Sequence, residues 1–216
     1  MKDTHTILMF LKFGQEKDIK DLYNNGTIYM NPIQLFRTVE DGELRGDSYE
    51  GVSRIKNYPP GKFEIPSIGY KGNYLSLHIR QSYKEVLGNI FSLYCISSHG
   101  WENPNDFKMD ERIKQFGSHC LMIKDNKSFM ERMENSLQNL KMKYLHGFVK
   151  YYDKESISRE ITVFEKPIEF EYQNEFRFYL NRFSTDPISF NIGSLADISE
   201  IFTAESIIDE LKLQPK

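Results

Sequence analysis

Two short stretches of the sequence concentrate the residue types that bind or transform small polar molecules. The first, residues 34–51, ends in Arg-Gly-Asp-Ser-Tyr-Glu-Gly, where two carboxylates flank a hydroxyl and a phenol and glycines permit close backbone approach. Such a loop could hold a ribose or a phosphate. It could also be a solvated turn in which the aspartate caps the chain and the first arginine pairs with an acid. Its candidate binding residues are Arg37, Arg45, Asp47 and Glu50.

The second stretch, residues 170–179, repeats this mixture of carboxylates, arginine and aromatic rings. Glu175 and Arg177 are two positions apart, so a strand would place both on one face. They could form a structural ion pair with the first stretch, or Glu175 could be a catalytic carboxylate. Gln173 and Arg177 are the candidate binding residues here. We therefore predict that residues 37–51 and 170–179 meet and form a charged pocket.

The elements that must bring these stretches together follow from the hydrophobic pattern. The chain has 216 residues, 39% of them hydrophobic and 14% aromatic, which is enough to build one core, and we predict a single domain over residues 1–216. Helical spacing is found in residues 15–25, 33–37, 127–141 and 204–213. Strand character is found in residues 7–13, 27–30, 89–97, 119–123, 142–152, 168–180 and 188–192.

Residues 52–98 read as β-rich, with turns at residues 59–61 and 71–73, which predicts a meander or a set of hairpins. Strands and helices do not alternate regularly along the chain, so a doubly wound nucleotide fold is disfavoured. The whole pattern predicts an α+β fold, with a curved, mostly antiparallel sheet flanked by a few helices.

Charge and motifs narrow the function classes. The net charge of -3 and the pI near 6.0 remove the broad electrostatic argument for binding nucleic acid or an anionic membrane. No stretch approaches the roughly 18 apolar residues of a membrane span, and the start lacks a signal-peptide pattern, so we expect a soluble cytoplasmic protein. Walker A, GxGxxG, GxSxG and HExxH motifs are absent from the sequence.

The cysteines and neighbouring histidines are the remaining candidates for a metal site. Cys95 and Cys120 lie in apolar strand-like runs, where a thiol behaves as a small buried hydrophobe. His119 and Cys120 are adjacent, so a strand would point them to opposite faces and prevent them from binding one ion together. We predict no metal site.

The order of several short segments resembles a family of bacterial proteins classed as a domain of unknown function. Those segments are KFG, NGTIYMNP, LFR, RGDSYEG, FSLYCIS, FGSHCLMI and FEKPIEFEYQNEFRFYL. The family has an early aromatic and Asn-Pro segment and a late Glu-x-Arg strand. Where it shows an Asn-Asp-Pro-Phe motif, this chain has Arg-Gly-Asp and Tyr-Glu-Gly at residues 45–51. The family has no settled activity, so the resemblance implies a fold and a cytoplasmic location rather than a reaction.

The run Gln173-Asn174-Glu175 also resembles the Q-x-E catalytic loop of ADP-ribosyltransferases. In those enzymes the glutamate stabilises the oxocarbenium-like ribose as nicotinamide leaves NAD, which is the electrostatic stabilisation that such chemistry needs. The resemblance implies a cationic residue early in the chain, either His5 or Arg37, and a polar residue on a middle strand, either Ser97 or Ser98.

Two functions from different classes follow. The first is a ligand- or partner-binding domain of a bacterial stress or phage-defence system, which takes a small nucleotide-like ligand or a protein partner and requires no cofactor. The alternative is an NAD- or nucleotide-acting enzyme that resembles an ADP-ribosyltransferase toxin, with Glu175 as its catalytic residue.

Overall fold

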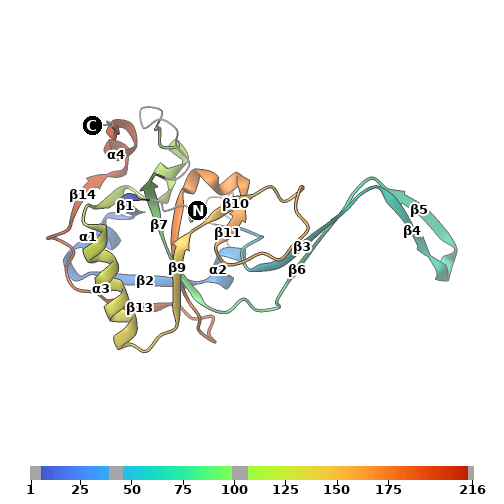
Figure 1. Ribbon diagram of the computed structural model, residues 1–216, viewed down its shortest axis with the longest axis horizontal. Helices are drawn as coiled ribbons and strands as arrows, with labels where there is room; N and C mark the ends of the chain where they lie inside the picture. Colours follow the sequence, from blue (N-terminus) through green and yellow to red (C-terminus); the bar gives the residue numbers. More distant parts are fainter. Residues whose placement is uncertain (1–5, 39–45, 99–106, 214–216) are drawn as a thin grey trace.

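The fold is α+β and is built on one large sheet. A computed structural model describes residues 6–38, 46–98 and 107–213 (Figure 1). Within these residues, eight strands form an open sheet in which all pairings are antiparallel. The predicted fold class is therefore confirmed.

The strand β7 (Asn89–Ser97) lies inside this sheet and is buried along almost its whole length. The path β13-β2-β7-β1-β8-β14 runs across the sheet, while β12 pairs with β7 and β9 pairs with β12. The bounds of these strands are β1 Ile7–Gly14, β2 Thr27–Pro32, β8 His119–Ile123, β9 Tyr144–Phe148, β12 Glu175–Leu180, β13 Ile188–Asn191 and β14 Ser199–Thr203.

Helices and short helical turns cover both faces of the sheet. The helices α1 (Glu16–Asn25) and α3 (Asn126–Asn139) bury their apolar stripes against one face, where they form the largest core cluster with β7 and β12. The 3-10 helix η3 (Glu111–Phe116) and α4 (Ala204–Glu210) cover the opposite face near β1 and β8. Among the described residues, no helix combines the length and apolar composition that crossing a membrane requires.

Residues 168–180 differ from the predicted strand. The first half is the 3-10 helix η4 (Ile168–Gln173), which ends at Asn174 in the left-handed region with φ of 42°, and only β12 is extended. Asparagine tolerates this conformation better than most residues, so the chain can turn sharply just before Glu175. Phe170 and Tyr172, which suggested strand structure, therefore lie in a 3-10 helix before β12 and not in a strand.

Two other strand predictions need correction. Residues 142–152 form β9 and the separate β10 (Lys150–Tyr152), and β10 pairs in parallel with β11 (Glu165–Pro167). The strand β14 was not predicted, because its sequence Ser-Glu-Ile-Phe-Thr has only two apolar residues and they do not alternate with polar ones. In the structure it lies at a sheet edge and none of its five residues is buried. The short helix α2 (Ile33–Thr38) agrees with the predicted helix at residues 33–37.

Residues 52–82 form a long projection, here called the arm, that extends from the body (Figure 1). Its base pairs β3 (Val52–Tyr58) with β6 (Leu77–Ser82), and its outer part pairs β4 (Gly61–Ile65) with β5 (Tyr70–Tyr74). A turn, η1 (Pro66–Ile68), closes the tip. The prediction of hairpin pairing in this β-rich segment is confirmed, but the turn predicted at residues 71–73 is wrong. Those residues lie within β5, and the chain reverses at residues 66–69 instead.

We predict that Gly26→Ala lowers the free energy of unfolding far more than Gly69→Ala. Both glycines have φ of 63°, but a Cβ at residue 26 would lie 1.9 Å from the Gly193 carbonyl oxygen, whereas residue 69 faces open space. The left-handed backbone costs about 1 kcal/mol in either variant, and steric displacement brings the cost at residue 26 to about 3 kcal/mol. Urea denaturation measures both, and equal losses would contradict this account of the Gly26 turn.

Candidate functional site

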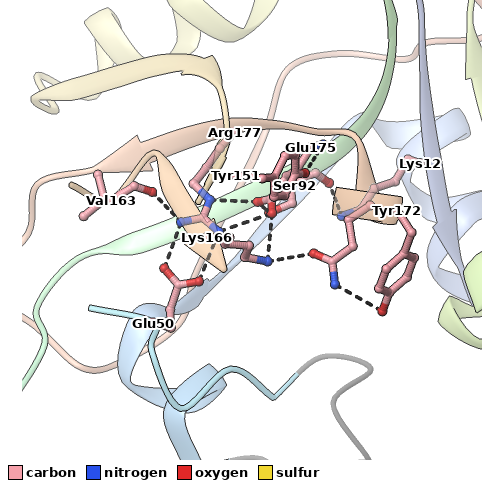
Figure 2. A network of polar contacts seen from close by, with 10 residues as sticks. Lys12, Glu50, Ser92, Tyr151, Val163, Lys166, Tyr172, Glu175 and Arg177 are labelled. Atoms are coloured by element: carbon pink, nitrogen blue, oxygen red, sulfur yellow. Dashed lines mark hydrogen bonds and ion pairs between the residues drawn. The ribbon is translucent and has the colours of Figure 1, made fainter. Parts of the chain in front are cut away.

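Arg177 is the centre of a buried polar network on one face of β12 (Figure 2). Its guanidinium is fully buried and donates a hydrogen bond from each of its five N–H groups. Two go to Glu50 at 2.8 and 3.1 Å, two go to Glu175 at 2.7 and 3.3 Å, and one goes to the Val163 carbonyl oxygen. Both carboxylates are therefore held in bidentate pairs, the strongest geometry for an arginine.

The predicted meeting of the two stretches is thus confirmed for Glu50, Glu175 and Arg177. Glu50 lies 127 positions before Arg177 in the sequence, yet the two side chains are in direct contact. Alternation on β12 sends Phe176, Phe178 and Leu180 to the opposite face, into the core beneath α3.

The Glu175 carboxylate has two further partners. Lys166 of β11 approaches it to 2.8 Å, and the Ser92 hydroxyl of β7 donates a hydrogen bond to Oε1. Burial alone would raise the pKa of Glu175, but the positive charges of Arg177 and Lys166 hold that pKa well below its ordinary range. Glu175 is therefore ionised, and each of its two carboxylate oxygens has two partners: Arg177 and Ser92 at Oε1, and Arg177 and Lys166 at Oε2.

Lys166 and Gln173 extend the network toward η4. The Lys166 ammonium donates to Gln173 Oε1 at 2.7 Å, and the Gln173 amide donates to the Tyr172 hydroxyl at 3.4 Å. The Glu175 backbone N–H donates to the Tyr151 hydroxyl at 2.9 Å. These bonds fix the turn before β12 and the side chains that it carries.

A cavity of about 690 Å³ opens beside this network, where the sheet is incomplete. Along one edge of β7, β1 pairs with residues 94–97 and β2 pairs with residues 89 and 90. Residues 91–93 lie between these two pairings and line the cavity. The helix α1 connects the two diverging strands and forms another wall.

The cavity walls combine aromatic rings with polar and charged groups. The rings belong to Phe13, Tyr29, Phe36, Phe91, Tyr94 and Phe116. The charged side chains belong to Lys12, Asp18, Asp21, Lys166 and Glu175. The Lys12 ammonium lies 4.3 Å from the centre of the Phe91 ring and donates to the Ser92 carbonyl oxygen at 2.7 Å, which positions a positive charge at the gap in the sheet.

Of the sequence-predicted site residues that the structure describes, only Gln173 and Glu175 line this cavity. Arg177, Glu50 and Asp47 are buried and do not line it, although Arg177 binds the cavity-lining Glu175 and is itself bound by Glu50. Arg37 donates instead to the Ser82 hydroxyl and the Tyr83 carbonyl oxygen, both at 3.1 Å. Arg45 and His5 lie outside the described residues.

Neither Ser97 nor Ser98 is the serine beside Glu175. The residue opposite Glu175 on β7 is Tyr94, and both serines lie beyond it toward the end of the strand, where Ser98 accepts from the Thr6 backbone N–H. Ser92 is the serine that contacts Glu175, because it lies opposite Arg177 in the pairing of β7 with β12 and its hydroxyl donates to Glu175. As the one serine within the largely apolar run NIFSLYC, it carried a signal that could have identified it.

Lys166 and Lys12 were also missed by sequence reasoning. Lys12 interrupts an apolar strand, which is a recognisable signal. Lys166 ends the charged segment of residues 153–166, where one more lysine does not stand out from its neighbours. Among the described residues, no three His, Cys, Asp or Glu side chains gather as metal ligands do. Cys95 and Cys120 are both buried thiols, and burial raises the pKa of Cys95 to about 12.

In the part of the chain that the structure describes, no cationic side chain contacts the buried Asp47 carboxylate directly. Its Oδ1 accepts from the Tyr49 backbone N–H at 2.7 Å, while Oδ2 has no hydrogen-bond partner among the described residues. Burial, and then the negative charge of Glu50, raise the pKa of Asp47 to about 6.

The chain matches no protein-family model, no curated protein and no solved structure. The resemblances named from the sequence therefore stay predictions, and the function has to be argued from the geometry of the network and the cavity.

We predict that Glu50→Gln lowers the free energy of unfolding by about 3 kcal/mol, because removing one carboxylate leaves the buried Arg177 charge undercompensated. Glu16→Gln is the control, since Glu16 pairs with Lys20 on the exposed surface of α1 and its loss should change the free energy of unfolding very little. Chemical denaturation measures both variants. Similar small losses would show that the buried pair contributes no more than a surface pair.

We predict that Asp47→Asn stabilises the chain at pH 8 and has little effect at pH 4. The pKa of Asp47 is raised on folding from 3.8 to about 6, so the folded state holds its proton more tightly, and the stability linked to this group falls as pH rises from about 4 to about 6. Asparagine keeps an acceptor for the Tyr49 N–H and abolishes this penalty, which is on the order of 2–3 kcal/mol. Thermal melts of both proteins across this range test it, and a pH-independent difference would contradict it.

Proposed function

We propose that this chain is a ligand-binding domain whose cavity, at the gap between β1, β2 and β7, takes a nucleotide-like small molecule. The observation that carries the proposal is a cavity of about 690 Å³ that ends on a wall made of Lys166, Gln173 and Glu175. Its volume lies within the roughly 300–1,000 Å³ range of small-molecule sites.

The composition of the walls supports a ligand with a planar ring and several hydroxyl groups. Tyr29 on β2 is 54% exposed, so its ring is accessible for stacking. Asp18 and Asp21 of α1 line the cavity as acceptors for hydroxyl groups, and Lys12 of β1 adds a positive charge to the wall. A nucleotide presents all three complementary features, namely a planar base, ribose hydroxyl groups and a negatively charged phosphate.

The network favours binding over catalysis by Glu175. A catalytic carboxylate must face a reacting atom or a developing charge. The Glu175 carboxylate already accepts from Arg177, Lys166 and Ser92 and is only 4% exposed. Its role in this proposal is to fix one wall of the cavity through Lys166 and Gln173.

A second candidate is the NAD-acting enzyme that resembles an ADP-ribosyltransferase. The observation in its favour is that Gln173 and Glu175, the two ends of the Q-x-E run, both line the cavity, with Ser92 of the middle strand β7 beside them. In this alternative a bound substrate would replace one of the groups that occupy Glu175.

One ligand survey tests both candidates. We predict that the purified chain gains thermal stability with one or more compounds from a panel of nucleosides, nucleotides and NAD. By calorimetry, Tyr29→Ser and Gln173→Ala should each weaken that binding by about tenfold or more, because each removes a wall contact worth about 1.4 kcal/mol. Gln138→Ala is the matched control, because Gln138 is exposed on α3 and does not line the cavity.

The outcomes are distinct for each candidate. If no compound shifts the melting curve, the proposal of a nucleotide-binding cavity is wrong. Release of nicotinamide from NAD that is lost in folded Glu175→Gln would replace the binding proposal with the enzyme. Saturable binding without turnover supports the binding domain.

A further inference from the structure

The outer part of the arm is a two-stranded ribbon with one apolar face and no cover. Phe63 and Ile65 of β4 share a face with Tyr70 and Tyr74 of β5, as the register of their antiparallel pairing requires. The opposite face carries the charged and polar side chains of Lys62, Glu64, Lys71 and Asn73. None of residues 56–85 is buried, so the apolar face lacks the second layer that a sheet normally packs against.

Two glycines on this face make room for aromatic rings of the neighbouring strand. A Cβ at Gly72 would lie 2.6 Å from the Phe63 ring, and a Cβ at Gly61 would lie 2.4 Å from the Tyr74 hydroxyl. Each ring therefore lies over the backbone of the glycine on the neighbouring strand. The rings of Phe63 and Tyr70 are also in contact, with centroids 5.9 Å apart. The result is a continuous apolar surface on the ribbon.

The exposure of this surface is large for apolar side chains. Ile65 is 42% exposed, Tyr70 is 54% exposed and Ile68 at the tip is 72% exposed. The outer backbone edges of β4 and β5 are not paired with any other strand among the described residues. Contiguous exposed apolar surface and open strand edges are both marks of a binding surface.

The charge distribution indicates what binds there. Residues 52–82 contain five Lys and Arg residues and one Glu, which gives the arm a formal charge of +4. Outside the arm, the described residues carry a formal charge of -4. The body of the same chain is therefore opposite in charge to the arm, but the arm projects away from its own body (Figure 1).

We propose that the arm binds the body of a second copy of this chain. In a two-fold symmetric dimer each arm would bind the partner's body, so that both apolar ribbons and both sets of opposite charges are buried in one isologous interface. This proposal is independent of the cavity, because neither β4 nor β5 lines it.

The test measures the mass of the full-length chain by light scattering over a range of protein and salt concentrations. A concentration-dependent dimer that dissociates more readily in high salt is expected for the intact chain. The double variant Ile65→Ser/Ile68→Ser should raise the dissociation constant by about tenfold or more, because it removes two exposed apolar side chains from the interface. Asn73→Thr on the opposite face of the same ribbon is the control and should dimerise as the intact chain does.

A second variant keeps the test independent of how the tip folds. Arg54→Glu/Lys56→Glu reverses two charges at the base of the arm and should weaken the dimer most at low salt. A chain that is monomeric at all concentrations, or a dimer that both double variants leave unchanged, would overturn the proposal. Arm-dependent binding of a monomer to anionic vesicles or to single-stranded DNA would overturn it too, by identifying a different occupant.

Discussion

The burial of the Arg177 guanidinium is the constraint on which the rest of this structure depends. Removing such an ion from water costs several kcal/mol, and only a complete set of acceptors offsets that cost. Glu175 supplies two acceptors from the same strand, and Glu50 supplies two from a segment 127 residues earlier. The Val163 carbonyl oxygen supplies the fifth. A chain that failed to bring residues 46–51 and 163–166 onto this face of the sheet would leave a buried charge without partners, so the network selects one arrangement of those segments.

The same network determines the shape of the cavity. Glu175 is held by Arg177 and in turn holds Lys166, which binds Gln173, so a wall of the cavity is fixed by bonds that lie behind it. The opposite side is open because β1 leaves β7 at Tyr94 and β2 joins it at Ile90. Part of the exposed backbone between them is satisfied by Lys12, which donates to the Ser92 carbonyl oxygen. A rigid polar wall facing a gap between strands is the physical basis for proposing a ligand site here.

The sequence predicted those features that depend on the spacing of residues within one element or on the attraction between opposite charges. The two-residue spacing of Glu175 and Arg177 predicted that they share a face, and their charges predicted contact with the earlier acidic stretch. Helical spacing over residues 127–141 predicted an apolar stripe of Phe129, Met133, Leu137 and Leu140. The first three are buried in α3, whereas Leu140 follows the last turn and is 46% exposed. Sequence reasoning failed at residues 168–173, where aromatic residues suggested a strand but the left-handed turn at Asn174 decides the local conformation. The roles of Ser92 and Lys166 depend on register between distant strands, which no pattern within either strand specifies.

The arm changes what the overall charge of the chain implies. A net charge of -3 argued against polyanionic partners when it was treated as a property of the whole surface. Among the described residues, the fold separates charge into an arm of +4 and a body of -4, and the arm projects away from the body (Figure 1). At physiological ionic strength the Debye length is about 8 Å, so a surface responds to the charges near it rather than to the sum over the molecule. The arm therefore presents a cationic, apolar surface, and in the proposed dimer its charge favours contact with the oppositely charged body of a second copy.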